Sequence, residues 1–239
     1  MHTRIVAVVG TAVFVAGVVV FANQGRRGAA DATASPAGAA AVATSAVTKT
    51  ASSPTPAVVG RTANLDDDPG DLLDVNGDAV KAGRLAADIL ALGVEARDGV
   101  LELNLYTAEA PPRGDDPVSH QHLYGWQLDM TGDMKSDWQV VVGNTTHADD
   151  ANIPGWVGQA TSFADSQTRF GRAFPGTIVV EGTRVSVRLP LDTIGVIREI
   201  GVAGFSLDAI SNDGARDEQH DSAPDNQWPD AASWVTVRP

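Results

Sequence analysis

Apolar and polar residues alternate along most of the chain beyond residue 60, which is the pattern of β-strands with one buried face. In "ILALGVEARDGVLELNLYT", apolar side chains fall on alternate positions over 90–94 and again over 101–105. The pair Asp98-Gly99 stands between the two runs, and both residues tolerate the positive φ angles of a type I′ turn. This stretch therefore predicts a β-hairpin.

Further short segments carry the same strand pattern and are separated by clusters of Gly, Asp, Asn and Pro. Together they predict an all-β domain over residues 61–239, built as an antiparallel two-sheet β-sandwich of the jelly-roll type. The segments are "HLYGWQLDM", "DWQVVVGN", "GWVGQATSF", "TIVVEG", "TRVSVRLP", "GVAGFSLDAIS" and "SWVTVR".

Residues 1–24 contain the uncharged apolar run "IVAVVGTAVFVAGVVVFA" behind Arg4, which predicts a signal peptide or an N-terminal membrane anchor. As a helix this run would extend roughly 27 Å, near the thickness of the bilayer core. Val20 and Ala22 suit a cleavage site, whereas the length suits a retained anchor, so both outcomes stay open. Either way, we expect a secreted or envelope-anchored, extracytoplasmic protein that meets the membrane only through this segment.

Residues 25–60 consist mainly of Ala, Thr, Ser, Pro and Val, as in "AADATASPAGAAAVATSAVTKTASSPTPAVV". Such a segment buries too little apolar surface to offset its ordering entropy, so it predicts a disordered linker. A linker of this kind would hold the folded domain away from a membrane.

The charge balance excludes some classes of partner. Lys and Arg number 17 against 30 Asp and Glu, which gives a formal net charge of −13. A surface of this sign repels a phosphate backbone, so nucleic-acid binding is not expected. The chain has no cysteine, which excludes disulfides, thiolate metal sites and a cysteine nucleophile.

Two acidic stretches raise the question of calcium. Asp74, Asn76 and Asp78 match the first half of an EF-hand loop, but Ala79 and Leu85 stand where the glycine and the final carboxylate belong. The pattern favours a polar turn, with a site shared among distant loops as the alternative. The stretch "NDGARDEQHDSAPDNQWPD" predicts a long acidic loop, either solvated or bridged by a cation.

The order of the segments resembles the DOMON-like sandwich superfamily, and especially the domains similar to family nine carbohydrate-binding modules of secreted bacterial proteins. The motifs that carry the likeness are "DDPGD", "ADILALGVEARDGVLELNLYTAEAPP", "YGWQLDMTGD", "SDWQVVVGN", "RVSVRLPLDTIG", "GFSLDAIS" and "DSAPDNQW". The resemblance implies a two-sheet fold, a ligand that is a sugar in some relatives, and often a structural calcium ion. It also implies that Asp71, Asp221 and Asp225 lie near that ion.

Sugar recognition uses aromatic platforms, because the C–H face of a sugar stacks on Trp or Tyr. Trp126, Trp138 and Trp234 fall within strand patterns and are expected in the core. Trp156 and Trp228 adjoin loops and are therefore the predicted ligand-binding platforms.

His120 and His122 are two residues apart, so in a strand both point to the same face. The pattern favours two solvent-exposed histidines, with a transition-metal site completed by His147 or Asp149 as the alternative.

The chain contains no Gly-x-Ser-x-Gly elbow, no phosphate-binding loop and no His-Glu-x-x-His motif. We therefore expect a non-enzymatic module that binds carbohydrate or a cell-envelope glycan, with a structural calcium ion as its only expected cofactor. A structural domain that binds an envelope protein is the alternative.

Overall fold

The computed structural model describes residues 62–74, 76–80, 83–112, 120–133, 135–145, 155–164, 167–195, 198–212, 215–223 and 234–239. All of them belong to one compact unit, Ala51–Pro239. The predicted signal or anchor, residues 1–24, and the predicted linker, residues 25–60, lie outside the described residues. Within the described part of the chain, no helix is long and apolar enough to cross a membrane.

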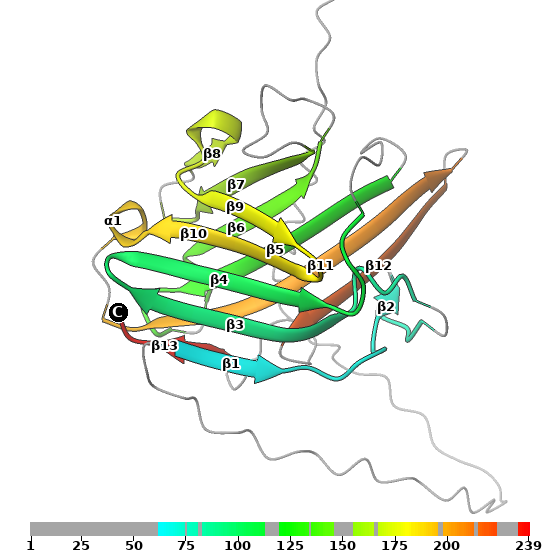
Figure 1. Ribbon diagram of the computed structural model, residues 1–239, viewed down its shortest axis with the longest axis horizontal. Helices are drawn as coiled ribbons and strands as arrows, with labels where there is room; N and C mark the ends of the chain where they lie inside the picture. The colour runs from blue at the N-terminus through cyan, green and yellow to red at the C-terminus, as the bar shows by residue number, and fades with distance from the viewer. Residues whose placement is uncertain are drawn as a thin grey trace, which may run out of the picture. The chain divides into compact units, whose positions relative to one another are not determined.

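The fold is a sandwich of two antiparallel sheets (Figure 1). The five-stranded sheet has the order β1-β3-β4-β10-β9. Its strands are β1 (Thr62–Asp66), β3 (Ile89–Arg97), β4 (Val100–Thr107), β10 (Arg184–Pro190) and β9 (Thr177–Glu181).

The second sheet has eight strands in the order β2-β12-β11-β5-β6-β7-β8, with β13 paired to the first residues of β11. Its strands are β2 (Leu73–Asp74), β5 (His120–Asp129), β6 (Trp138–Asn144), β7 (Trp156–Ser162), β8 (Thr168–Phe170), β11 (Ile200–Asn212), β12 (Ala215–Ala223) and β13 (Val235–Val237). A 3-10 turn, Gly171–Ala173, and a four-residue helix, α1 (Leu191–Ile194), complete the described elements.

The apolar residues of the alternating patterns meet between the two sheets. Leu101, Leu103 and Leu105 of β4 are fully buried there, as are Trp126 of β5 and Val140 of β6. Because alternate side chains of a strand point to opposite faces, the period of two in the sequence becomes one buried face on each sheet. The predicted two-sheet antiparallel sandwich is therefore confirmed.

The predicted hairpin is also confirmed. Strands β3 and β4 pair up to Arg97 and Val100, and Asp98 and Gly99 connect them with φ angles of 52° and 78°. Two consecutive positive φ angles are what a type I′ turn requires, and they match the twist of the flanking strands.

The sequence prediction was wrong about part of the acidic stretch. Ala215–Ala223 is not a loop but strand β12, paired along β11 from Gly204 to Asn212. It shows no apolar alternation, because two of its inward side chains are polar: Gln219 is 7% exposed and Asp221 is 5% exposed. Gln219 accepts a hydrogen bond from the N–H of Arg84, in the segment before β3, and Asp221 accepts one from the N–H of Ile89, the first residue of β3. Both buried polar side chains are therefore satisfied.

Candidate functional site

One end of the space between the sheets is polar. Figure 1 shows that β11 and β12 extend past the ends of β3 and β4, so their inner faces are not covered by the five-stranded sheet there. Residues 83–88, which we call the covering segment, pack on this surface instead. The hydroxyl of Tyr124 donates to the Ala86 carbonyl at 2.8 Å, and that of Ser206 donates to the Ala87 carbonyl.

Three carboxylates meet at the end of the covering segment. Asp71 precedes β2, Asp88 directly precedes β3, and Asp221 lies on the inner face of β12. They form the acidic triad, whose ligand oxygens all lie within 4.8 Å of one another. Asp88 and Asp221 are buried, at 2% and 5% exposure, and Asp71 is partly buried.

Backbone hydrogen bonds fix two carboxylates of this triad. The N–H of Gly70 donates to both oxygens of Asp88, at 3.0 and 3.1 Å. The N–H of Ile89 donates to Asp221 Oδ2 at 2.6 Å, and that of Ser222 donates to Asp221 Oδ1 at 2.8 Å. The positions of these oxygens are therefore set by strand β12 and by the two ends of the β1–β3 connection.

The acidic triad could hold a metal ion, and its chemistry fits calcium. Calcium binds oxygen ligands at about 2.3–2.6 Å, so two oxygens on one ion lie at most about 5 Å apart. The 4.8 Å limit of the triad satisfies this condition. Three carboxylates in a largely buried place also repel one another, and a dication would relieve that repulsion.

A second cluster lies on the same inner face, near Arg84 at the start of the covering segment. It consists of His120 and His122 on β5 and Asp208 on β11, and we call it the histidine cluster. His120 Nε2 lies 3.0 Å from Asp208 Oδ1, and His122 Nδ1 lies 3.0 Å from Asp208 Oδ2. The two imidazole ring centres are 4.0 Å apart.

The expectation of two solvent-exposed histidines is wrong for this cluster. His122 is 1% exposed, and only His120 reaches solvent, with 27% of its side chain exposed. The reason is that β5 carries both histidines on its core-facing side, in line with Tyr124 and Trp126. Two other proposed ligands, His147 and Asp149, lie outside the described residues.

Arg84 of the covering segment neutralises Asp208. Its Nε forms an ion pair with Asp208 Oδ1, its Nη2 donates to the Asp208 carbonyl at 2.8 Å, and its Nη1 contacts Asp217 Oδ2 at 2.8 Å. Burial acts to raise the pKa of Asp208, but hydrogen bonds from His122 and His120 and the charge of Arg84 outweigh it. The net result is that the pKa of Asp208 lies below its ordinary value.

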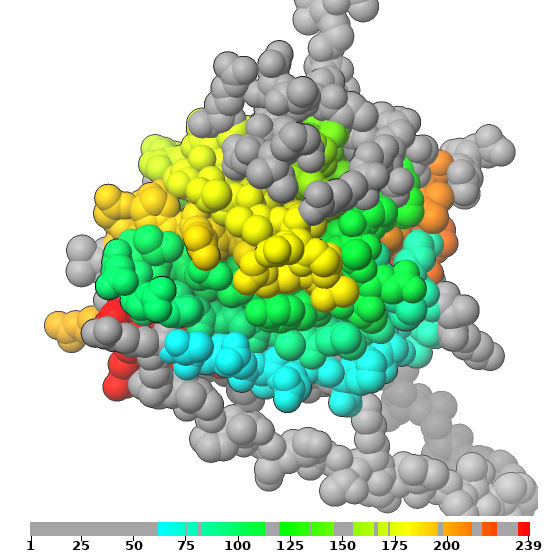
Figure 2. All heavy atoms as spheres, viewed as in Figure 1, coloured from blue at the N-terminus to red at the C-terminus, as the bar shows by residue number. Residues whose placement is uncertain are grey.

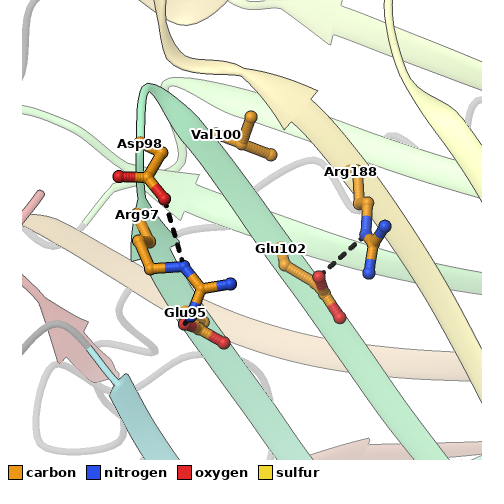
Figure 3. Close-up of a pocket in the computed structure, with 6 residues that line it drawn as sticks. All are labelled: Glu95, Arg97, Asp98, Val100, Glu102 and Arg188. Atoms are coloured by element: carbon orange, nitrogen blue, oxygen red, sulfur yellow. Dashed lines mark hydrogen bonds and ion pairs between the residues drawn. The ribbon is translucent and has the colours of Figure 1, made fainter.

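The outer face of the five-stranded sheet is polar and carries a hollow of about 220 Å³ beside the β3–β4 turn. Figure 3 shows Glu102 and Arg188 pointing toward each other from neighbouring strands, with a 2.8 Å ion pair between them. Arg97 contacts Glu95 and Asp98 at 3.3 and 3.4 Å, and Val100 completes the lining.

A row of small residues crosses the same sheet beside this hollow. Gly93, Asn104 and Ser186 are in register on β3, β4 and β10, with Asn64 of β1 next to Gly93. The Ser186 hydroxyl donates to Asn104 Oδ1 at 2.5 Å. Tyr106 lies two residues beyond Asn104 on the same outward side of β4, with Ala91 of β3 and Arg184 of β10 as its register neighbours. Tyr106 is 37% exposed.

Of the two predicted sugar platforms, Trp156 does not lie on this face. Trp156 is 0% exposed and packs against Tyr124 in the core, with ring centres 5.8 Å apart. A stacking platform needs an exposed ring face, which Trp156 does not offer. Trp228 lies outside the described residues. The core positions expected for Trp126 and Trp234 are confirmed, and Trp138 packs against the core while partly buried.

Of the three aspartates expected near an ion, the structure brings Asp71 and Asp221 together, and it adds Asp88. Asp225 lies outside the described residues. The EF-hand-like stretch is a turn, as the sequence favoured: Asp74 Oδ1 accepts from the N–H groups of Asn76 and Asp78, at 2.8 and 2.9 Å. Its carboxylate is therefore engaged with its own loop.

Sequence reasoning missed Arg84 and Asp208. A signal for Asp208 existed, because it is a charged residue at an inward position of β11, in step with the buried Val202 and Ser206. No comparable signal marked Arg84, whose partners are more than 120 residues away along the chain.

No family model matches this chain, and comparison with curated proteins finds no match.

Proposed function

We propose that this chain is an exported, non-enzymatic binding module that recognises carbohydrate, such as a cell-envelope glycan, on the outer face of its five-stranded sheet. The observation that carries the proposal is Tyr106, a 37% exposed aromatic residue on the polar outer face that also carries the hollow beside the β3–β4 turn. This face is toward the viewer in Figure 2, with β1 in cyan, β3 and β4 in green and β9 and β10 in yellow.

The side chains of this face include the kinds of groups by which proteins bind sugars. The ring of Tyr106 offers a surface for C–H stacking, and the carboxylate of Glu102 and the guanidinium groups of Arg184 and Arg188 offer partners for hydroxyl groups. Tyr106 and Glu102 are four residues apart on β4, which corresponds to about 13 Å along a strand. That span is longer than one sugar ring, so an oligosaccharide suits the face better than a monosaccharide.

The two-sheet antiparallel sandwich is the architecture that the resemblance to DOMON-like and family nine carbohydrate-binding domains implies. We extend the proposal to that superfamily. The acidic triad would then hold a structural calcium ion that ties the segment before β2 to β3 and β12. The ion would stabilise the domain and take no part in ligand contact.

A glycan array probed with the full chain, in calcium, tests the proposal. We expect binding to at least one oligosaccharide class and a loss on the order of tenfold in affinity for Tyr106→Ala, equivalent to about 1.4 kcal/mol. Phe163→Ala is the matched control, because Phe163 is a similarly exposed aromatic residue, at 46%, beyond the end of β7. The control should bind like the unaltered chain.

Two outcomes would overturn the proposal. One is that no glycan binds. The other is that glycan binding survives in Tyr106→Ala at full strength, which would move the ligand away from this face. In the first case, the ion-paired outer face would favour the alternative of a domain that binds an envelope protein.

A further inference from the structure

We propose that His120, His122 and Asp208 form a binding site for a divalent transition-metal ion of the zinc class, separate from the acidic triad. This inference does not depend on carbohydrate binding. It rests on the histidine cluster, which brings two imidazoles and one carboxylate together from β5 and β11.

The distances fit a small coordination sphere. The two nitrogen–oxygen separations in the cluster are both 3.0 Å, and all ligand atoms lie within 4.8 Å of one another. Tetrahedral zinc with bonds of about 2.0–2.1 Å separates its ligand atoms by roughly 3.3 Å. Small rotations of the side chains would therefore allow all three groups to bind one ion.

The donor atoms decide the class of ion. Two imidazole nitrogens with one carboxylate suit zinc, copper or nickel, whereas calcium and magnesium prefer oxygen ligands alone. The acidic triad on the same inner face offers only oxygens, so the two clusters should select different ions. Three protein ligands would also leave a coordination position for water.

The backbone beneath the histidines is fixed in place. Asn144 of β6 accepts from the His122 N–H at 3.0 Å and donates to the His120 carbonyl at 2.7 Å. His122 and Asp208 are directly opposite in the β5–β11 register. The ligands are thus held before an ion arrives, and His120, with 27% of its side chain exposed, makes the cluster accessible from solvent.

Arg84 should lower the affinity of this site for a metal ion. Its guanidinium contacts Asp208 Oδ1, the oxygen that also faces His120. A bound dication would lie close to this positive charge, and repulsion between the two would reduce affinity. Arg84 also forms an ion pair with Asp217, and this pair can persist when a metal ion binds Asp208.

Titration of the full chain with Zn²⁺, in a millimolar excess of Ca²⁺ that occupies oxygen-only sites, tests the proposal. Co²⁺ in place of Zn²⁺ gives a direct signature, since imidazole ligation of cobalt produces visible absorption. His120→Gln is the loss variant, because His120 is the least buried ligand, and His220→Gln on the opposite face of the same sheet is the control. Arg84→Met tests whether repulsion between the Arg84 guanidinium and the bound ion lowers the affinity for Zn²⁺.

We expect micromolar or tighter Zn²⁺ binding by the unaltered chain and the control, at least tenfold weaker binding by His120→Gln, and tighter binding by Arg84→Met. Circular dichroism of each variant checks that the sheets have formed. Absence of Zn²⁺ binding by the unaltered chain would overturn the proposal. So would Zn²⁺ binding and a cobalt spectrum that are the same in His120→Gln as in the unaltered chain.

Discussion

His122 of β5 and Asp208 of β11 face each other directly in the strand register, with Nδ1 and Oδ2 3.0 Å apart and both side chains nearly fully buried. Asp208 also contacts Arg84, so the covering segment is tied to the centre of the eight-stranded sheet by a buried charge. An intact buried ion pair adds little to folding stability, because both charges lose their hydration. Removing one partner is strongly destabilising, because the other charge then stays buried without compensation.

Asp208→Asn should destabilise the domain by about 3 kcal/mol, because Arg84 would keep its charge in a place with 19% side-chain exposure and lose its main partner. Urea unfolding of the full chain measures the change. The control is Glu199→Gln, which removes an exposed pair with Arg238 and should cost less than about 0.5 kcal/mol. Equal effects of the two substitutions would contradict the ion-pair interpretation.

Tyr124→Phe should cost about 1–2 kcal/mol, because it leaves the buried Ala86 carbonyl without the donor that now lies at 2.8 Å. Burial, with a smaller contribution from the charge of Asp208, raises the pKa of Tyr124, so this hydroxyl stays a donor throughout the ordinary pH range. Hydrogen exchange of the amides in residues 84–89 should accelerate. Tyr106→Phe, on an exposed ring, is the control and should leave both stability and exchange unchanged.

Calcium should raise the melting temperature, and a chelator should lower it. At a hundredfold excess over the dissociation constant, one bound ion stabilises by about 2.7 kcal/mol, equivalent to roughly 5–10 °C for a domain of this size. Asp71→Asn should abolish this response, since Asp71 belongs to the acidic triad. Asp192→Asn, an exposed aspartate in α1, should keep it. An identical calcium response in both variants would remove the acidic triad as the site.

Asp74 should titrate below its ordinary value of 3.8, because the backbone N–H groups of Asp78 and Asn76 bond to its ionised form. A lowered folded-state pKa means that this stabilisation is complete above the unfolded value and is lost as the pH falls through the folded value. The amide chemical shifts of Asn76 and Asp78 should therefore change with a midpoint below pH 3.8. An acid titration followed by NMR measures this, and Asp74→Ala should abolish the transition.

Much of the architecture was predictable because it follows from local patterns. The hairpin at Asp98-Gly99 needed only two alternating runs and a turn that tolerates positive φ. The covering segment could not be predicted in the same way, because its contacts with Tyr124, Ser206 and Gln219 pair backbone groups with side chains from distant strands. Strand β12 could not be predicted for the same reason. An aspartate is unusual on the inward face of a strand, and Asp221 is buried there because the N–H of Ile89, far away along the chain, donates to it.

The sequence by itself determined that this chain forms antiparallel strands with one apolar face each, since the period of side-chain alternation is a local property of the backbone. Only the tertiary structure decided which polar residues meet: Asp88 with Asp71 and Asp221, and Asp208 with the two histidines. It also placed Trp156 in the core and left Tyr106 exposed. The physical reason is that a cluster of ligands depends on strand order and register, and these are set by packing across the whole sandwich.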